Sequence, residues 1–247
     1  MKNIHILLLS ISTFVLSCAK NDENSPTPNV EDPKLPSIAL TKATNDNTNW
    51  NLEIKADNAD QNQLWIDVNN NGIKDAGEAI TNLTSTSSVP MASRTIVIHG
   101  KVNYLSCLDN KLTSLDVSKN SLLKTLICSV NQLKTLDLSN NIALENLICS
   151  GNQLEALDLS KNINVKSINI SFNKITGSNM GQFINNLPMR TAENFGVTYL
   201  YNLDKSDYRN PVEYNTAPTE ASVNIAKAKK WKLLYMKENN DRNWSEL

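Results

Sequence analysis

The sequence predicts a mainly β protein in which a coil of about four repeating turns lies between a small amino-terminal β domain and a carboxy-terminal α+β cap. Three observations lead to this prediction. Nearly the same letters return every 21 residues, as at Leu105, Leu126 and Leu147. Before these repeats, short segments alternate apolar and polar residues as strands do. After them, the apolar residues take the spacing of a helix.

The first residues are a predicted targeting segment (1–17) followed by a tether (18–36). Residues 6–16 form an apolar run of 11 residues, which is too short to span a bilayer and is typical of a secretory signal. The run ends in VLSC, which resembles the lipobox of bacterial lipoproteins. This resemblance implies cleavage before Cys18 and lipid attachment to that cysteine, and an ordinary cleaved signal is the alternative. The polar, proline-punctuated residues after Cys18 are expected to be a tether.

The stretch KNDE shortly after Cys18 resembles the acidic export signal of surface lipoproteins from Bacteroidota. The resemblance implies a lipoprotein of the outer membrane that is exposed at the cell surface. The formal net charge of −1 gives no reason to expect a nucleic-acid partner.

Residues 37–91 are predicted to form a separate β domain with a calcium loop. Two segments alternate in the manner of strands, WNLEI and LWIDV. The sequence DVNNNGIKDAGE then fits the calcium-loop pattern D-x-[DN]-x-[DN]-G-x5-E, in which oxygen ligands surround a hard cation and a glycine permits the sharp turn. The predicted Ca²⁺ ligands are Asp67, Asn69, Asn71, the carbonyl of Ile73, Asp75 and Glu78. The loop resembles those of the GEVED type in bacterial surface proteins, and a metal-free polar hairpin loop is the alternative.

Residues 92–176 contain the repeats, and each 21-residue unit carries the motif L-x-x-L-x-L-x-x-N twice. This motif is the core of a leucine-rich repeat. An asparagine stands where each coil turns, and its amide can satisfy backbone groups that would otherwise stay unpaired. The asparagines predicted to form two such ladders are Asn110, Asn120, Asn131, Asn141, Asn152, Asn162 and Asn173. The double motif resembles the nested repeat class called IRREKO, which implies a solenoid whose units need stacked neighbours.

The stack is predicted to begin before the clean repeats, because Ile96 and Val102 stand one period before Val117 and Leu123. Cys107, Cys128 and Cys149 are predicted to be small core residues, because parallel side chains on adjacent strands are poorly placed for a disulfide.

Residues 177–247 are predicted to cap the open end of the stack. Met180, Phe183, Ile184 and Leu187 have helical spacing and are followed by Pro188. A strand over 195–202, a helix over 217–230 and a strand over 231–236 complete the expected cap.

The sequence predicts a recognition module that binds a protein partner and is not an enzyme. The only histidine after the signal, His99, stands in register with the asparagines, and neither a phosphate loop nor a nucleophile motif is present. The alternatives are a glycan-binding lipoprotein of a polysaccharide-degrading system and a structural spacer. The L-D-L strands turn Asp116, Asp137 and Asp158 outward, which predicts a solvated face. The partner-binding residues are predicted on the other face and are Tyr104, Ser106, Ile127, Ile148 and Asn169.

Overall fold

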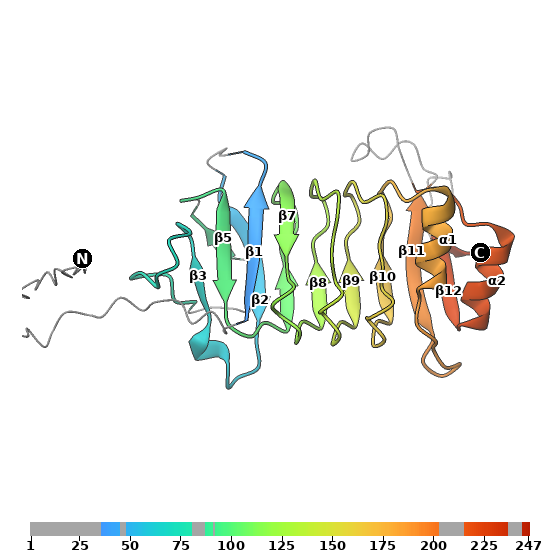
Figure 1. Cartoon of the computed structure of the whole chain (residues 1–247), viewed down its shortest axis with the longest axis horizontal. Helices are drawn as coiled ribbons and strands as arrows, with labels where there is room; N and C mark the ends of the chain where they lie inside the picture. The colour runs from blue at the N-terminus through green and yellow to red at the C-terminus, as the bar shows by residue number, and fades with distance from the viewer. Residues whose placement is uncertain (1–35, 45–47, 81–86, 91, 203–214, 237–243) are drawn as a thin grey trace, which may run out of the picture.

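The structure, a computed structural model, describes residues 36–44, 48–80, 87–90, 92–202, 215–236 and 244–247. The predicted signal peptide, Cys18 and the tether up to residue 35 lie outside these ranges. Within them the chain is mainly β with two short α-helices, which confirms the predicted class. Figure 1 shows the strands side by side along the long axis of the molecule.

One layer is a nine-stranded sheet. Its strands, in spatial order, are β4 (Ser87–Val89), β2 (Trp50–Lys55), β6 (Tyr104–Ser106), β8 (Thr125–Ile127), β9 (Asn146–Ile148), β10 (Ser167–Asn169), β11 (Gly196–Asn202), β12 (Trp231–Met236) and β13 (Trp244–Glu246). The pairs from β6 to β12 are parallel, and the outer pairs at both ends are antiparallel. Leu105 pairs with Leu126 and Leu126 with Leu147, so residues one repeat apart lie next to each other in a continuous buried row.

The second layer begins with a four-stranded antiparallel sheet. Its strands, in spatial order, are β3 (Trp65–Asp67), β5 (Thr95–His99), β1 (Ser37–Lys42) and β7 (Leu112–Asp116), and the 3-10 turn η1 (Gln61–Gln63) precedes β3. The segment around Ile96 does not stack directly on the one around Val117, as its register had suggested, because β1 lies between β5 and β7 and pairs with both. β1 fits this place because Ile38 and Leu40 alternate into the core while its backbone pairs along both edges.

Of the three predicted L-D-L strands, only the first forms a strand, in β7. Residues 133–138 and 154–159 continue this layer without a strand ladder. Their leucines are still buried. Asn162 Nδ2 donates a hydrogen bond to the carbonyl of Leu138. Side chains thus supply hydrogen bonds that a neighbouring strand would otherwise make.

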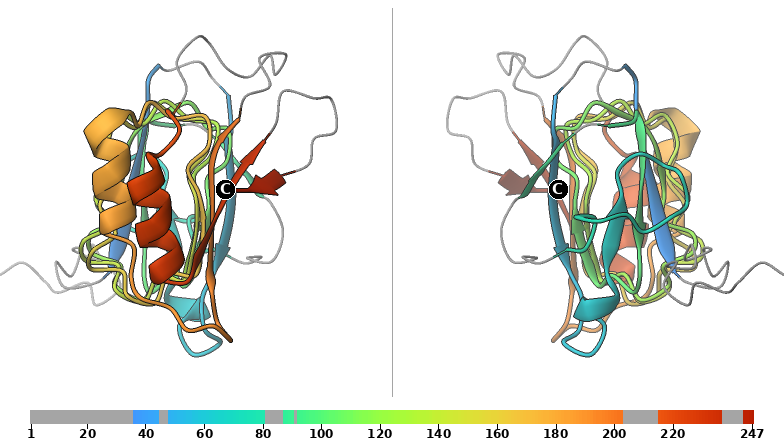
Figure 2. Two further views of the ribbon diagram at one scale, coloured as in Figure 1. Left: turned by 90° about the vertical axis from the view of Figure 1, so that its right-hand side faces the viewer. Right: turned by 90° about the vertical axis from the view of Figure 1, so that its left-hand side faces the viewer.

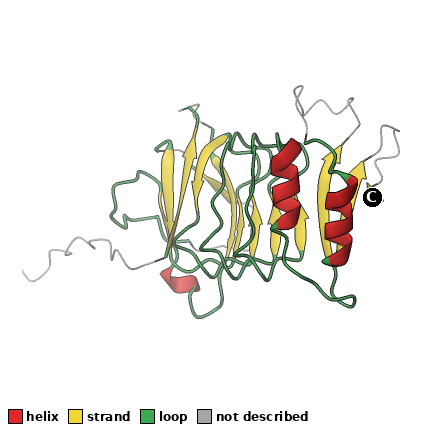
Figure 3. Cartoon of the chain, turned by 45° about the vertical axis from the view of Figure 1, so that its right-hand side comes forward, coloured by secondary structure: helices red, strands yellow, loops and turns green. Residues whose placement is uncertain are grey.

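Two helices complete the second layer at the carboxyl end, α1 (Gly177–Asn185) and α2 (Glu220–Ala228). Figure 2 shows them on one side of the stack and the strands of the cap on the other, and Figure 3 shows them in front of the sheet. α1 buries Met180, Phe183 and Ile184, and the side chain of Thr219 caps α2 by accepting a bond from the backbone N–H of Ser222. Each helix has nine residues, so neither described helix is long enough to cross a bilayer.

One apolar core runs through the molecule, from Ile38 in β1 through the leucines of the coils to Leu233 in β12. The amino-terminal strands belong to it, because β2 pairs with β6 and β1 pairs with β7. The predicted boundary between residues 91 and 92 therefore does not separate two bodies. The amino-terminal strands close one end of the stack, as the cap closes the other.

Candidate functional site

Four of the predicted ladder asparagines lie at the turns that follow β6, β8, β9 and β10. They are Asn110, Asn131, Asn152 and Asn173, and all are buried. Asn131 Nδ2 donates to the carbonyls of Cys107 and Cys128, both at 3.0 Å, and its Oδ1 accepts a bond from the backbone N–H of Leu112 at 2.9 Å. The amides of the next two asparagines make equivalent bonds one coil further on. Each amide thus joins two successive coils.

A fifth asparagine extends this ladder into the cap. Asn215 Nδ2 donates to the carbonyls of Ile170 and Leu200 at 2.7 and 2.6 Å, and its Oδ1 accepts from the N–H of Ile175 at 2.8 Å. Asn215 is not among the predicted ladder residues, because it stands two repeat lengths after Asn173, beyond the last clean unit. A search at multiples of the period would have found it.

The second ladder consists of Asn120, Asn141 and Asn162, and it bonds differently. Asn141 Nδ2 donates to the carbonyls of Val117 and Asn120, both at 2.9 Å, and the amide of Asn162 repeats this pattern. The Oδ1 atoms of Asn141 and Asn162 are buried and have no hydrogen-bond partner among the described residues. This ladder therefore acts mainly through its donors.

Cys107, Cys128 and Cys149 form a buried column behind the first ladder, and all three are free thiols. Burial raises the pKa of Cys107 and of Cys149 to about 12. Burial, with its two neighbours, also raises the pKa of Cys128 well above its usual range. The thiolate is the nucleophilic form of cysteine, so thiols with a raised pKa are unreactive. The three cysteines therefore pack as small core residues.

The six predicted calcium ligands lie in one loop that begins at the end of β3. Asp67 and Glu78, the first and last of them, are buried. The Asp67 carboxylate accepts bonds from the N–H groups of Asn71 and Gly72 at 3.1 and 2.8 Å, and Glu78 accepts two more backbone N–H groups at 3.0 and 2.8 Å. Gly72 adopts a left-handed φ of 75°, which the sharp turn requires.

The side-chain amides of Asn69 and Asn71 bond to other groups of this loop. Both Nδ2 groups donate to the Asp75 carboxylate at 2.9 Å, and Asn71 Oδ1 accepts from the N–H of Ile73 at 2.8 Å. A carbonyl oxygen has two lone pairs, so it can bond an N–H group and still face a cation. This oxygen-rich donor set suits Ca²⁺ by its chemistry. As placed, however, no three His, Cys, Asp or Glu side chains of the described chain are grouped closely enough to hold a metal ion.

The five predicted partner-binding residues lie on the outer face of the nine-stranded sheet, and all are partly exposed. Ser106, Ile127, Ile148 and Asn169 form one column, because each pairs with the next across parallel strands. The column continues into the cap through Tyr199, which pairs with Asn169. Side chains on this face therefore stand about 4.8 Å apart from strand to strand.

Polar and aromatic groups border this face at both ends. At the amino-terminal end, the Tyr104 hydroxyl donates to Glu53 at 3.1 Å, and Lys55 forms an ion pair with Glu53 at 2.8 Å. The hydrogen bond from Lys55 lowers the pKa of Glu53, and burial and the bond to Glu53 raise the pKa of Tyr104. At the carboxy-terminal end, Tyr199 meets Trp244 edge to face, with ring centroids 4.9 Å apart.

The opposite layer carries the acidic column Asp116, Asp137 and Asp158, all exposed. Each carboxylate accepts a bond from the backbone N–H two residues later, at 2.8 to 2.9 Å. These serine contacts lower the pKa of each aspartate. The carboxylates are thus held ionised by local turns, as suits a solvated face.

No protein-family model matches the chain, and no curated protein sequence matches it. Among solved structures, the functional domain of InlJ from Listeria monocytogenes, described as including a cysteine ladder, is 25% identical with a TM-score of 0.29. The match covers 41% of this chain and 27% of that one.

His99 does not lie among the turn asparagines with which it is in register. It belongs to β5, where it is buried and its ring stacks on that of Trp65 with centroids 3.9 Å apart. The insertion of β1 beside β5 accounts for the difference, because the chain at His99 is paired in an antiparallel sheet and does not turn there.

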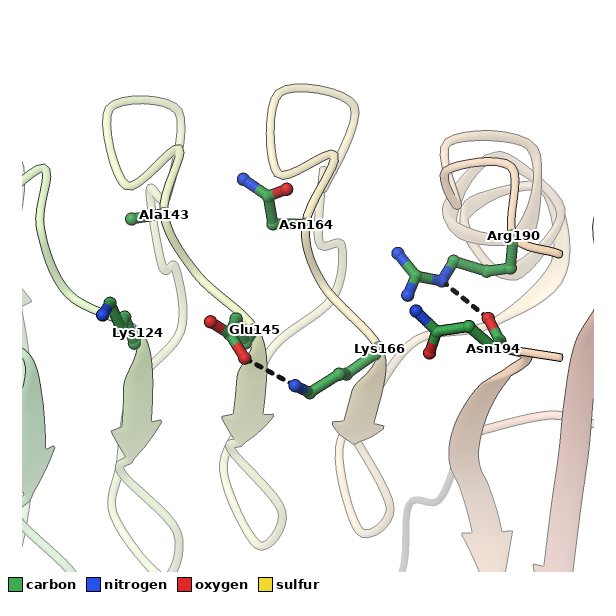
Figure 4. Close-up of a pocket in the computed structure, with 7 residues that line it drawn as sticks. All are labelled: Lys124, Ala143, Glu145, Asn164, Lys166, Arg190 and Asn194. Atoms are coloured by element: carbon green, nitrogen blue, oxygen red, sulfur yellow. Dashed lines mark hydrogen bonds and ion pairs between the residues drawn. The ribbon is translucent and has the colours of Figure 1, made fainter.

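A polar groove of about 440 Å³ lies along the edge of the nine-stranded sheet where β8, β9 and β10 begin (Figure 4). Lys124, Glu145 and Lys166 line it, one from each coil, and Arg190 and Asn194 line it from the loop between α1 and β11. This groove was not predicted from the sequence. The charged residues one period apart, directly before each strand, were the available signal.

Proposed function

We propose that the chain is a surface-tethered, non-enzymatic recognition module, built as a leucine-rich-repeat solenoid of about four turns. It binds a protein partner through the outer face of the nine-stranded sheet. The observation that carries this proposal is the column of partly exposed side chains in which Ile127 and Ile148 stand side by side on adjacent parallel strands. A rigid sheet that presents apolar side chains at fixed spacing suits protein binding, because few groups must be ordered on association.

The proposal includes a lipid anchor at Cys18 and exposure on the outer membrane, which rest on the VLSC and KNDE stretches of the sequence. It also includes Ca²⁺ in the loop from Asp67 to Glu78. The ion would be held by the oxygen atoms of that loop and would draw its carboxylates together, since it supplies the positive charge that they lack. Its part would be to stabilise the amino-terminal end of the stack.

The test of the binding face is the double substitution Ile127→Lys and Ile148→Lys. The chain is immobilised, and capture of proteins from the surface of its own cells is compared with that by Thr135→Lys plus Ala156→Lys. The control pair adds the same charge at exposed positions of two adjacent coils in the other layer. We expect the face variant to lose a partner that the wild type and the control retain, with all three proteins melting alike. Retention of every partner by the face variant would overturn the proposal.

A glycan is the second candidate ligand for the same face. It is favoured by Tyr104 and by the Tyr199–Trp244 pair, because aromatic rings form apolar platforms for sugars. A glycan array probed with the wild type and with Tyr199→Ala decides between the two. Binding of a defined glycan that Tyr199→Ala abolishes would favour this second function over protein recognition.

A further inference from the structure

The edge groove carries cationic side chains that the fold aims outward. The backbones of Lys124, Glu145 and Lys166 are fixed in the ladder between coils: Glu145 N–H donates to the Lys124 carbonyl and Lys166 N–H to the Glu145 carbonyl, both at 2.8 Å. Their side chains therefore leave the sheet at the same edge, one per coil, as Figure 4 shows. The groove is lined by three cationic side chains and one carboxylate.

The single carboxylate is already matched. Lys166 Nζ lies 2.5 Å from Glu145 Oε2, and this hydrogen bond, with a smaller effect of the nearby Lys124 charge, lowers the pKa of Glu145. Lys124 has no hydrogen bond or ion pair from its ammonium group to any described residue. The guanidinium of Arg190 donates from Nε to the Asn194 carbonyl at 3.3 Å. Its terminal nitrogens bond no described residue, so Lys124 and Arg190 remain available to an anion at the two ends of the groove.

The most exposed apolar residues of the described chain are close neighbours in sequence of the residues that line this groove. Met189, Ile163 and Ile142 are 68%, 66% and 57% exposed, and each directly precedes a residue that lines the groove. The next two are Leu122 at 48% and Phe195 at 44%. Leu122 lines a smaller hollow of about 120 Å³ that shares Lys124 with the groove, and Phe195 directly follows Asn194. Large exposed apolar residues concentrated in one place mark contact surfaces.

We infer that this groove is a second binding surface, which takes an extended peptide segment carrying both carboxylates and aliphatic side chains. Its carboxylates would meet Lys124 and Arg190, and its aliphatic side chains would meet Ile142, Ile163 and Met189. Asn164 Nδ2 already donates to the Ile142 carbonyl at 3.0 Å, and the remaining amide groups of Asn164 and Asn194 offer donors and acceptors to the peptide backbone. This inference does not depend on the proposed binding face of the sheet, because the groove residues Lys124, Glu145 and Lys166 directly precede the strands that carry that face.

The chemistry of the lining favours an acidic peptide over an acidic glycan. The apolar residues at the groove are mostly aliphatic, whereas sugars stack on aromatic rings. Phe195, which directly follows the lining residue Asn194, already has the ammonium group of Lys232 over its ring, with Nζ 4.7 Å from the ring centroid. Cations with interspersed aliphatic side chains complement a strand of alternating acidic and aliphatic residues.

The test measures binding of a fluorescent synthetic peptide of alternating Glu and Leu to the full chain by anisotropy. Its Gln-for-Glu counterpart and soluble polygalacturonate are the comparison ligands. We expect saturable binding of the acidic peptide only, weakened about tenfold by Lys124→Glu plus Arg190→Glu and weakened by added salt. The matched control, Lys134→Glu plus Arg94→Glu, makes the same change in net charge at exposed positions that do not line the groove, and it should bind like the wild type.

A second variant tests the apolar contacts and leaves the charges of the groove unchanged, in case charge reversal disturbs the fold. Ile142→Ser plus Ile163→Ser removes exposed apolar groups, so the melting temperature should hold while peptide affinity falls several-fold. No binding of the acidic peptide, equal binding of its Gln counterpart, or wild-type affinity in both groove variants would overturn the inference. Preferential binding of polygalacturonate that depends on Lys124 and Arg190 would also overturn it, in favour of a glycan site.

Discussion

At the scale of single residues, the asparagines explain why the sequence repeats so strictly. Each coil buries a turn whose backbone groups have no strand partner, and only a short side chain with both a donor and an acceptor can serve both kinds of group. Asn131 does this for two coils at once. The period in the sequence made these roles predictable. The difference between the two ladders was not predictable, because it depends on which backbone groups neighbouring strands have already satisfied.

That difference leads to a prediction for Asn131→Ala and Asn141→Ala. Both remove the same atoms from a buried site, but only Asn131 also accepts a backbone N–H through Oδ1. At about 1–3 kcal/mol for each buried group left unpaired, Asn131→Ala should cost the larger free energy of unfolding, about 3 kcal/mol or more. Urea denaturation measures both. Equal losses would mean that the accepting oxygen contributes nothing.

The left-handed backbone conformation at one turn position could not be predicted from the sequence. Asp109, Val130, Gly151 and Phe172 stand one period apart, and all have a left-handed φ of 53° to 65°. A glycine fits this conformation and a β-branched residue does not, so the register of the coil overrides the preference of Val130.

Val130→Asn should therefore stabilise the protein, by about 1 kcal/mol, because asparagine tolerates left-handed φ far better than valine. Val130 is partly solvent-exposed, so little packing is lost. Differential scanning calorimetry should show a higher melting temperature. A matched change at a position with ordinary φ, Thr135→Asn, should give no gain, and a lower melting temperature for Val130→Asn would show that its methyl contacts outweigh the strain.

At the scale of elements, the loop after β3 shows where spacing is a good guide and where it is not. The residues that match the calcium pattern lie in one loop, with Asp67 and Glu78 buried and bonded to its backbone N–H groups. Spacing does not reveal how the donors bond to each other. In the structure the amides of Asn69 and Asn71 donate hydrogen bonds to the Asp75 carboxylate. A bound cation would have to replace these two hydrogen bonds.

Calcium should raise the melting temperature of the chain, and chelator should reverse the rise. At a tenfold excess over the dissociation constant, binding adds about 1.4 kcal/mol to the free energy of unfolding. Glu78→Gln should lose this increment, because the carboxylate at the twelfth position is the bidentate ligand of such loops. Melting in calcium and in chelator, for both proteins, measures the effect. The same melt in both solutions for the wild type would leave the loop as a metal-free hairpin.

At the scale of the whole molecule, the main departure from the sequence prediction is the place of residues 37–91. The repeats are recognisable by their period, and the alternating strand segments before residue 92 suggested a separate domain. Strand pairing between distant segments leaves no such mark, so nothing in the sequence showed that β1 would lie between β5 and β7 or that β2 would extend the sheet beyond β6. The helical cap was more predictable, because its apolar spacing is local.

This arrangement predicts that a chain beginning at residue 92 will not fold to a stable monomer. It would lose Ile38, Leu40, Trp50, Leu52 and Ile54 from the core. At about 2 kcal/mol for each buried apolar side chain, the loss is about 10 kcal/mol, comparable to the whole stability of a typical protein. It would also expose the edges of β6 and β7, and unpaired edges favour aggregation.

The matched control is a chain beginning at residue 36, which keeps β1, β2 and the bond from the Gly100 N–H to the Pro36 carbonyl at 2.8 Å. Size-exclusion chromatography and thermal melting compare the two chains with the full one. We expect the chain from residue 36 to melt as the full chain does, and the chain from residue 92 to aggregate or to show no cooperative transition. A monomeric chain from residue 92 that melts within a few degrees of the full protein would instead mean that the repeats close their own end. The amino-terminal strands would then be an attached domain, as the sequence pattern predicted.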